Sequence, residues 1–160
     1  MGERAERAYS YFMEGFTCAQ SLFTAFADIF GFDKETALKV SAGLGGGVGR
    51  MREVCGVVTS ASMILGLMYG ATDGADRASK AYTYEKVREF AEKFKALEGT
   101  IICRELLGLE KAEESHIPEE RTKEYYSSRP CPRITREAAE ILEEMIEEYF
   151  ASQDKNNKQN

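Results

Sequence analysis

The chain has 160 residues, of which 43% are hydrophobic and 30% charged, with three prolines and no tryptophan. This composition is typical of one globular domain and excludes a fibrous or extensively disordered chain. The formal net charge of −6 argues against nucleic acid as a partner, because such a surface needs clustered basic residues to displace counterions.

Apolar residues recur at helical spacing along most of the chain. Residues 5–13 and 19–30 each carry one apolar stripe, which predicts two amphipathic helices. Gly31 then ends the second helix, and Asp33 is suited to cap a short third helix that reaches Leu44. Residues 54–70 are apolar nearly all round, so we expect a buried central helix enclosed by the others. Within it, Gly56 and Gly66 are small enough to let neighbouring helices approach closely.

The segment after residue 75 predicts a long amphipathic helix that ends at Gly99. Its predicted inner face includes Tyr84, Phe94 and Leu97. A short helix then begins at a Thr100 cap.

A last helix is expected over 134–150, followed by a disordered polar tail at 151–160. No segment alternates like a strand. The sequence therefore predicts an all-α single domain over 1–150, a bundle of about six to seven helices around a buried apolar central helix.

The chain shows no targeting segment. Its first residues carry charges at once, without the apolar core of a signal peptide. Residues 54–70 are short for a membrane crossing and contain polar side chains. We therefore expect a cytoplasmic protein without membrane insertion, where disulfides are not a default structural element.

Four cysteines carry the main chemical signal, and none belongs to a Cys-x-x-Cys pair. Each is at or near the start of an expected helix, where free backbone N–H groups and the helix dipole stabilise a thiolate. An isolated cysteine is more often a small buried hydrophobe, but four at helix starts favour a functional cluster. These candidate catalytic residues are Cys18, Cys55, Cys103 and Cys131.

The stretch "GLGGGVGRMREVCGVV", residues 43–58, raises the question of a phosphate-binding loop. It lacks both the Gly-x-Gly-x-x-Gly spacing after a strand and the Gly-Lys-Ser/Thr of a Walker loop. We interpret it as the setting that holds Cys55 as a thiolate, with a small-anion site as a secondary hypothesis. A flexible connection between helices stays open as an alternative. The setting comprises Gly45, Gly46, Gly47, Gly49, Arg50, Arg52 and Gly56.

Other catalytic interpretations are weaker. His116 is the only histidine and follows an acidic stretch, so we interpret it as a surface residue rather than as the base of a Cys–His pair. Tyr125 and Tyr126 are likewise interpreted as a surface or docking pair.

Taken together, "GFTCAQS", "AGLGGGVGRMREVCGVVTSASMILGLMYG", "IICRELLG" and a cysteine before the last helix resemble the C-GCAxxG-C-C family of redox-active proteins. The resemblance covers about residues 5–148. It implies that the four cysteines are the family cysteines and that Gly56 is the motif glycine. Val57 and Ser60 stand where the motif has alanine and glycine, and their added bulk is expected to exclude or shift a closely approaching partner or cofactor.

Three functions follow as hypotheses. In the first, cysteine thiols carry out dithiol/disulfide exchange or electron transfer with an unidentified redox partner protein, Cys55 attacking and a second cysteine resolving. In the second, the four cysteines ligate zinc or an iron–sulfur cluster. In the third, the chain is a non-enzymatic helical interaction module with packed cysteines. The sequence leaves open whether the chain is a thiol-based oxidoreductase, whether any cofactor is bound and whether copies associate.

Overall fold

The computed structural model describes residues 2–111 and 115–157. These residues form α1 (Glu3–Met13), α2 (Cys18–Ala27), α3 (Lys34–Ser41), α4 (Gly56–Tyr69), α5 (Arg77–Glu98), α6 (Cys103–Leu106), α7 (Lys123–Ser128) and α8 (Cys131–Asn157), with single 3₁₀ turns after α2 and α3. The all-α prediction is confirmed. The described ranges contain eight α-helices against the predicted six to seven, and the unpredicted one is the short helix α7.

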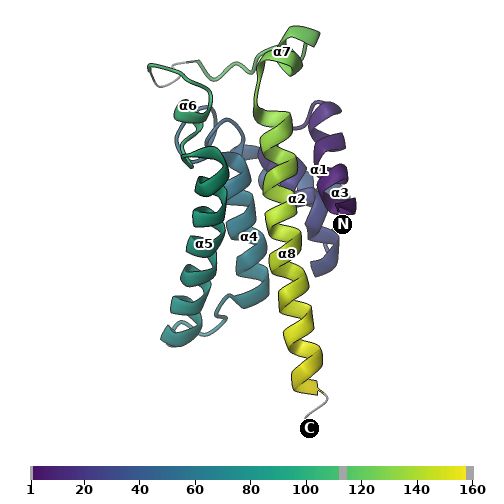
Figure 1. The fold of residues 1–160 in the computed structure, drawn as a ribbon, viewed down its shortest axis with the longest axis vertical. Helices are drawn as coiled ribbons and strands as arrows, with labels where there is room; N and C mark the ends of the chain where they lie inside the picture. Colours follow the sequence, from purple (N-terminus) through teal and green to yellow (C-terminus); the bar gives the residue numbers. More distant parts are fainter. Residues whose placement is uncertain (1, 112–114, 158–160) are drawn as a thin grey trace.

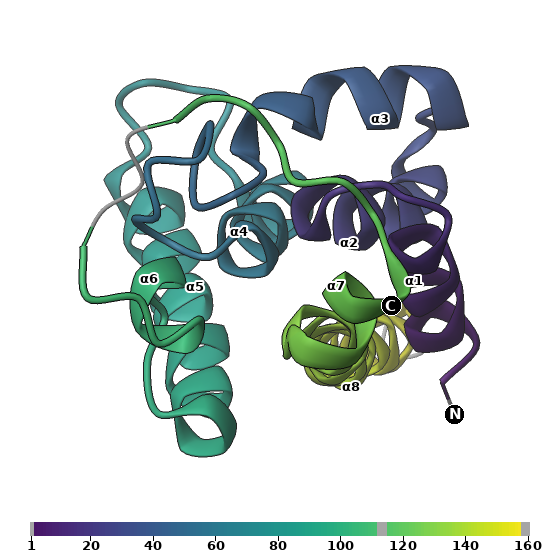
Figure 2. The same ribbon diagram turned by 90° about the horizontal axis from the view of Figure 1, so that it is seen from above.

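The apolar helix α4 packs against α2, α5 and α8, which confirms its predicted place inside the bundle. Figures 1 and 2 show it between these three neighbours. Helix α2 is buried to a greater extent than its amphipathic pattern predicted, with only two of its ten residues not buried, Cys18 and Gln20. The core therefore centres on the pair formed by α2 and α4. None of the described helices has the length and apolar character needed to cross a membrane.

Side-chain caps begin α2 and α3 where the sequence places them. At the start of α2, the Gln20 N–H donates to Thr17 Oγ1 at 3.2 Å, and the Thr17 N–H donates to Gln20 Oε1 at 3.1 Å. This reciprocal capping box fixes Cys18 as the first helical residue. Asp33 caps α3 by accepting from the Thr36 N–H at 2.9 Å, as predicted.

The predicted inner face of α5 is too wide. Phe90 and Phe94 are buried, whereas Tyr84 is 67% and Leu97 60% exposed. Helix α5 lies at the edge of the bundle (Figure 2) and covers its neighbours with a narrow stripe only.

Two predicted helix limits are wrong. Helix α6 begins at Cys103, because the Thr100 hydroxyl accepts a hydrogen bond from the Ile102 N–H at 3.1 Å instead of capping a helix. Helix α8 begins three residues earlier than predicted and continues to Asn157, so residues 151–157 extend a helix rather than form a disordered tail. Residues 158–160, also assigned to that tail, lie outside the described residues.

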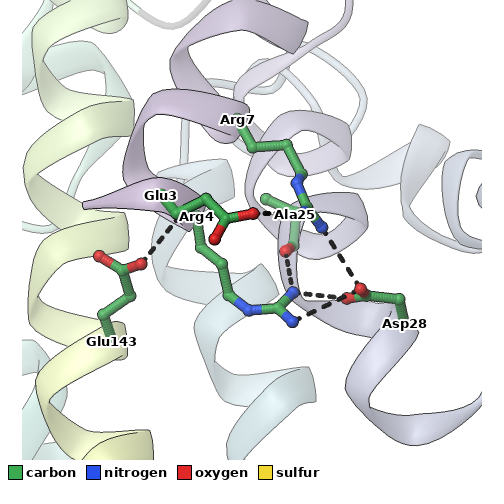
Figure 3. A network of polar contacts seen from close by, with 6 residues as sticks. All are labelled: Glu3, Arg4, Arg7, Ala25, Asp28 and Glu143. Atoms are coloured by element: carbon green, nitrogen blue, oxygen red, sulfur yellow. Dashed lines mark hydrogen bonds and ion pairs between the residues drawn. The ribbon is translucent and has the colours of Figure 1, made fainter. Parts of the chain in front are cut away.

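The N-terminus of α1 is held by charged contacts to α2 and α8 (Figure 3). Glu143 on α8 accepts from the Arg4 N–H at 2.8 Å, which satisfies one free donor of the first turn. The Arg4 guanidinium donates to the Ala25 carbonyl at 2.6 Å and pairs with Asp28 at 2.5 Å, and Arg7 reaches the same carboxylate at 3.3 Å. These contacts tie the start of α1 to both neighbours.

Candidate functional site

All four cysteines line one cavity of about 410 Å³ at the end of the bundle where α6 and α7 lie. Cys18, Cys103 and Cys131 are the first residues of α2, α6 and α8, and Cys55 is the N-cap of α4. The predicted placement of every cysteine at a helix start is confirmed. The structure also shows that the four helix N-termini face the same cavity, which the sequence could not show.

Cys18 and Cys55 interact directly within the cavity. The two side chains are hydrogen-bonded to each other, joining the N-termini of α2 and α4. A Cβ at Gly56 would lie 2.7 Å from the Cys18 sulfur and 3.0 Å from the Ala19 Cβ. Only glycine at position 56 therefore lets α2 bring its sulfur this close to the start of α4.

The two thiols of this pair have opposite pKa shifts. The hydrogen bond from Cys55, helped by the backbone N–H groups of Ala19, Gly46 and Gly56, lowers the pKa of Cys18 to about 7 against the opposing effect of burial. The same hydrogen bond and burial raise the pKa of Cys55 well above its ordinary value. The lower pKa of the pair therefore belongs to Cys18, and not to Cys55 as the sequence predicted.

Backbone hydrogen bonds between distant segments place Cys103 near Cys55. The Cys55 N–H donates to the Ile101 carbonyl at 2.8 Å, and the Cys103 N–H donates to the Glu53 carbonyl at 2.6 Å. Between them, Val54 and Ile102 form an isolated antiparallel bridge. This short ladder places the segment before α4 beside the segment before α6 and brings two distant cysteines to one wall.

The glycine-rich loop supports Cys18 and Cys103 rather than Cys55. The Gly46 N–H bonds to the Cys18 sulfur. A Cβ at Gly47, whose φ is +66°, would lie 2.7 Å from the Cys103 Cβ. Gly46 and Gly47 of the loop therefore lie against Cys18 and Cys103, whereas the sequence predicted a setting for Cys55.

Arg50 and Arg52, which were predicted to support Cys55, contact other residues. Arg52 is buried, and its Nη1 donates to the Cys103 sulfur at 3.7 Å. Burial still raises the pKa of Cys103, with Arg52 opposing the shift. Arg50 donates to the carbonyls of Ser115 and Ile117 and so reaches the segment that leads to α7.

Cys131 lies on the α8 side of the cavity, where burial raises its pKa to about 12. Nearby lie residues that sequence reasoning missed. Arg121 stacks between the rings of Phe12 and Tyr125, at 4.5 and 4.6 Å from their centroids. Arg129 pairs with Glu119 at 2.5 Å. In the sequence, these residues are indicated only by arginines interspersed among acidic residues before α8.

Two surface assignments need correction. Tyr125 lines the cavity and is partly buried, and burial raises its pKa. Its neighbour Tyr126 donates from its hydroxyl to the Met13 carbonyl at 3.2 Å. The pair therefore attaches α7 to α1 rather than forming a docking surface. His116 is exposed, as expected, yet it also lines the cavity.

The two departures from the family motif lie outside the cavity. Val57 is fully buried in the core, and the Ser60 hydroxyl donates to the Ala19 carbonyl of α2 at 2.8 Å. Because neither residue lines the cavity, the expected exclusion of a partner or cofactor from the site does not follow from their bulk.

A protein metal centre needs three or four ligand side chains gathered around one point. Within residues 2–111 and 115–157, no group of three or more His, Cys, Asp or Glu residues is arranged to hold a metal ion. The four sulfurs share a cavity without forming a ligand set. All four cysteines are free thiols.

An all-α bundle whose four cysteines begin four helices around one cavity defines a class of four-cysteine helical proteins. The chain belongs to the family described as "Putative redox-active protein (C_GCAxxG_C_C)", whose model matches residues 16–145. The predicted family is thereby confirmed. Comparisons with curated proteins and with solved structures gave no match.

Proposed function

We propose that this protein is a dithiol/disulfide redox protein in which Cys18 is the attacking thiolate and Cys55 the resolving thiol. One observation carries the proposal: two hydrogen-bonded sulfurs in a cavity, one with its pKa lowered to about 7 and the other held protonated. A thiol with a pKa near the ambient pH is the best attacking group, since it is largely ionised yet still strongly nucleophilic.

The reaction follows from this division of roles. The Cys18 thiolate attacks one sulfur of a substrate disulfide, whose S–S bond breaks and releases one thiolate. Cys55 then loses its proton to solvent, and its sulfur attacks the Cys18 sulfur of the mixed disulfide. The second substrate thiolate leaves, and the Cys18–Cys55 pair is oxidised by two electrons. A dithiol on a redox partner protein returns the pair to the reduced state by the reverse exchange.

The test is a reaction of reduced protein with a neutral aryl disulfide, dithiodipyridine, followed by mass spectrometry. Wild-type protein should release two equivalents of thiopyridone and become two mass units lighter, with Cys18 and Cys55 in one cross-linked peptide. Cys55→Ser should stop at the mixed disulfide on Cys18, and Cys18→Ser should lose the fast phase. Cys131→Ser is the matched control and should behave as wild type.

Two results contradict the proposal. Equal and slow modification of all four cysteines would favour the interaction module with packed cysteines. A bound mass in native spectra of anaerobically purified protein that disappears on denaturation would favour the metal or cluster hypothesis.

A further inference from the structure

Arginines form most of the charged lining of the cavity around Cys18. The described residues that line it include four arginines and a single carboxylate, Glu119. The lining arginines are Arg50, Arg52, Arg121 and Arg129. Arg50 and Arg52 are engaged in contacts within the fold, which leaves Arg121 and Arg129 as the candidate cations for a ligand. The N-termini of α2, α4 and α8 add their partial positive charges to the same space.

The positive charge is held in fixed positions. Arg121 donates to the carbonyls of Phe12 and Phe16 at 3.3 and 3.1 Å. Its guanidinium also lies against the rings of Phe12 and Tyr125. Because these partners are neutral, they leave the charge of Arg121 uncompensated. Arg129 lies beside the Tyr125 ring at 5.2 Å and shares Glu119 with Arg50, which approaches that carboxylate at 3.9 Å.

The remaining walls are apolar, with Phe12, Leu106, Leu107 and Ile134 among the lining side chains. The volume of about 410 Å³ lies within the roughly 300–1,000 Å³ typical of small-molecule sites. Apolar walls with fixed cations fit a small organic anion better than an inorganic ion, which would leave the apolar surface uncovered.

We propose that the oxidising substrate of the Cys18–Cys55 pair is a low-molecular-weight disulfide that bears carboxylate groups. This inference rests on the proposed function and adds the chemistry of the substrate. The carboxylate binds at the arginines while the disulfide faces Cys18. The substrate accepts two electrons and leaves as two thiols, and the cysteine pair becomes a disulfide.

The experiment compares two aryl disulfides of similar size, the dianionic dithiobis(nitrobenzoate) and the neutral dithiodipyridine. The measured quantity is the ratio of their second-order rate constants at low ionic strength. The ratio cancels any change in the nucleophilicity of Cys18. Removing one positive charge a few ångströms from the bound anion should lower the ratio about three- to tenfold.

Arg129→Gln should show this loss, and Arg129→Lys should restore most of the ratio by restoring the charge. The matched control is Arg88→Gln, because Arg88 is exposed on α5 and outside the cavity lining. High salt should reduce the wild-type ratio towards that of Arg129→Gln.

The two proposals fail in different ways. A ratio in Arg129→Gln equal to that of wild type and Arg88→Gln, with fast reaction of the neutral reagent throughout, overturns the substrate inference alone. Slow reaction of wild type with the neutral reagent, at the rate of an unfolded peptide thiol, overturns the proposed function and this inference together.

Discussion

The clearest structural prediction concerns Gly56, where replacement by alanine should act on both packing and chemistry. The new Cβ would lie 2.7 Å from the Cys18 sulfur and 3.0 Å from the Ala19 Cβ, so α2 and α4 must separate. Overpacking of this kind costs about 1–3 kcal/mol. The helix-propensity gain of alanine is at most about 1 kcal/mol. We expect Gly56→Ala to lower the free energy of unfolding by about 1 kcal/mol.

The same separation should weaken the hydrogen bond that lowers the pKa of Cys18. If that pKa rises from about 7 to about 9, the thiolate fraction at pH 7 falls from about one half to about one hundredth. The more basic thiolate is intrinsically about eightfold more nucleophilic towards a disulfide. The net expectation is about a sixfold slower reaction with dithiodipyridine at pH 7.

Gly66 provides a control in the same helix, since a Cβ there meets nothing within 4 Å. Gly66→Ala should raise the free energy of unfolding by about 0.5–1 kcal/mol and leave the thiol reaction unchanged. Urea unfolding of the reduced proteins and stopped-flow kinetics at pH 7 measure the two effects. Equal stability and equal rates in Gly56→Ala and Gly66→Ala would refute the reasoning.

Three further predictions concern individual contacts. The reaction rate of Cys18 with a neutral disulfide should rise with pH around a midpoint of about 7. Cys55→Ala should move that midpoint to higher pH, because the principal hydrogen bond to Cys18 is lost. An unmoved midpoint would contradict the pairing of Cys18 with Cys55. The folded-state pKa of Cys131, about 12, lies above that of an unfolded thiol at about 8.5, so wild type should lose stability as pH rises through this window. The free energy of unfolding of Cys131→Ala, measured by urea titration at the same pH values, should fall less than that of wild type. Equal falls in the two proteins would contradict the raised pKa of Cys131. Glu143→Ala should cost about 1 kcal/mol of stability by removing a cap from α1, whereas Glu144→Ala, at an exposed position of α8, should be nearly neutral.

Much of the fold was predictable because its signals are local. Asp33 marks a helix start through a side-chain hydrogen bond over three residues, and this predicted start is confirmed. Thr17 with Gln20 is a local signal of the same kind at the start of α2. The apolar run of α4 likewise predicts burial without any knowledge of its neighbours. The extension of α8 beyond Phe150 was missed because polar composition alone does not end a helix that has already begun.

The candidate site was predictable only in part, for a physical reason. Each cysteine's place at a helix start follows from local pattern, but the convergence of the four depends on long-range contacts. The pairing of Val54 with Ile102 has no local signature, and it decides that Cys103 faces the cavity. Gly66 shows the converse: a small residue suggested close helix packing, yet open space lies beside it.

The choice between Cys18 and Cys55 shows why position at a helix start does not by itself define a thiolate. Two sulfurs in contact cannot both ionise without strong repulsion, so the charge goes to the sulfur with more hydrogen-bond donors. Cys18 receives N–H groups from its own helix, from the glycine-rich loop and from the start of α4. The contact with Cys18, together with burial, raises the pKa of Cys55, and burial raises the pKa of Cys103 and of Cys131. The proposed exchange needs such an asymmetric pair, with one sulfur of low pKa beside a second sulfur of raised pKa.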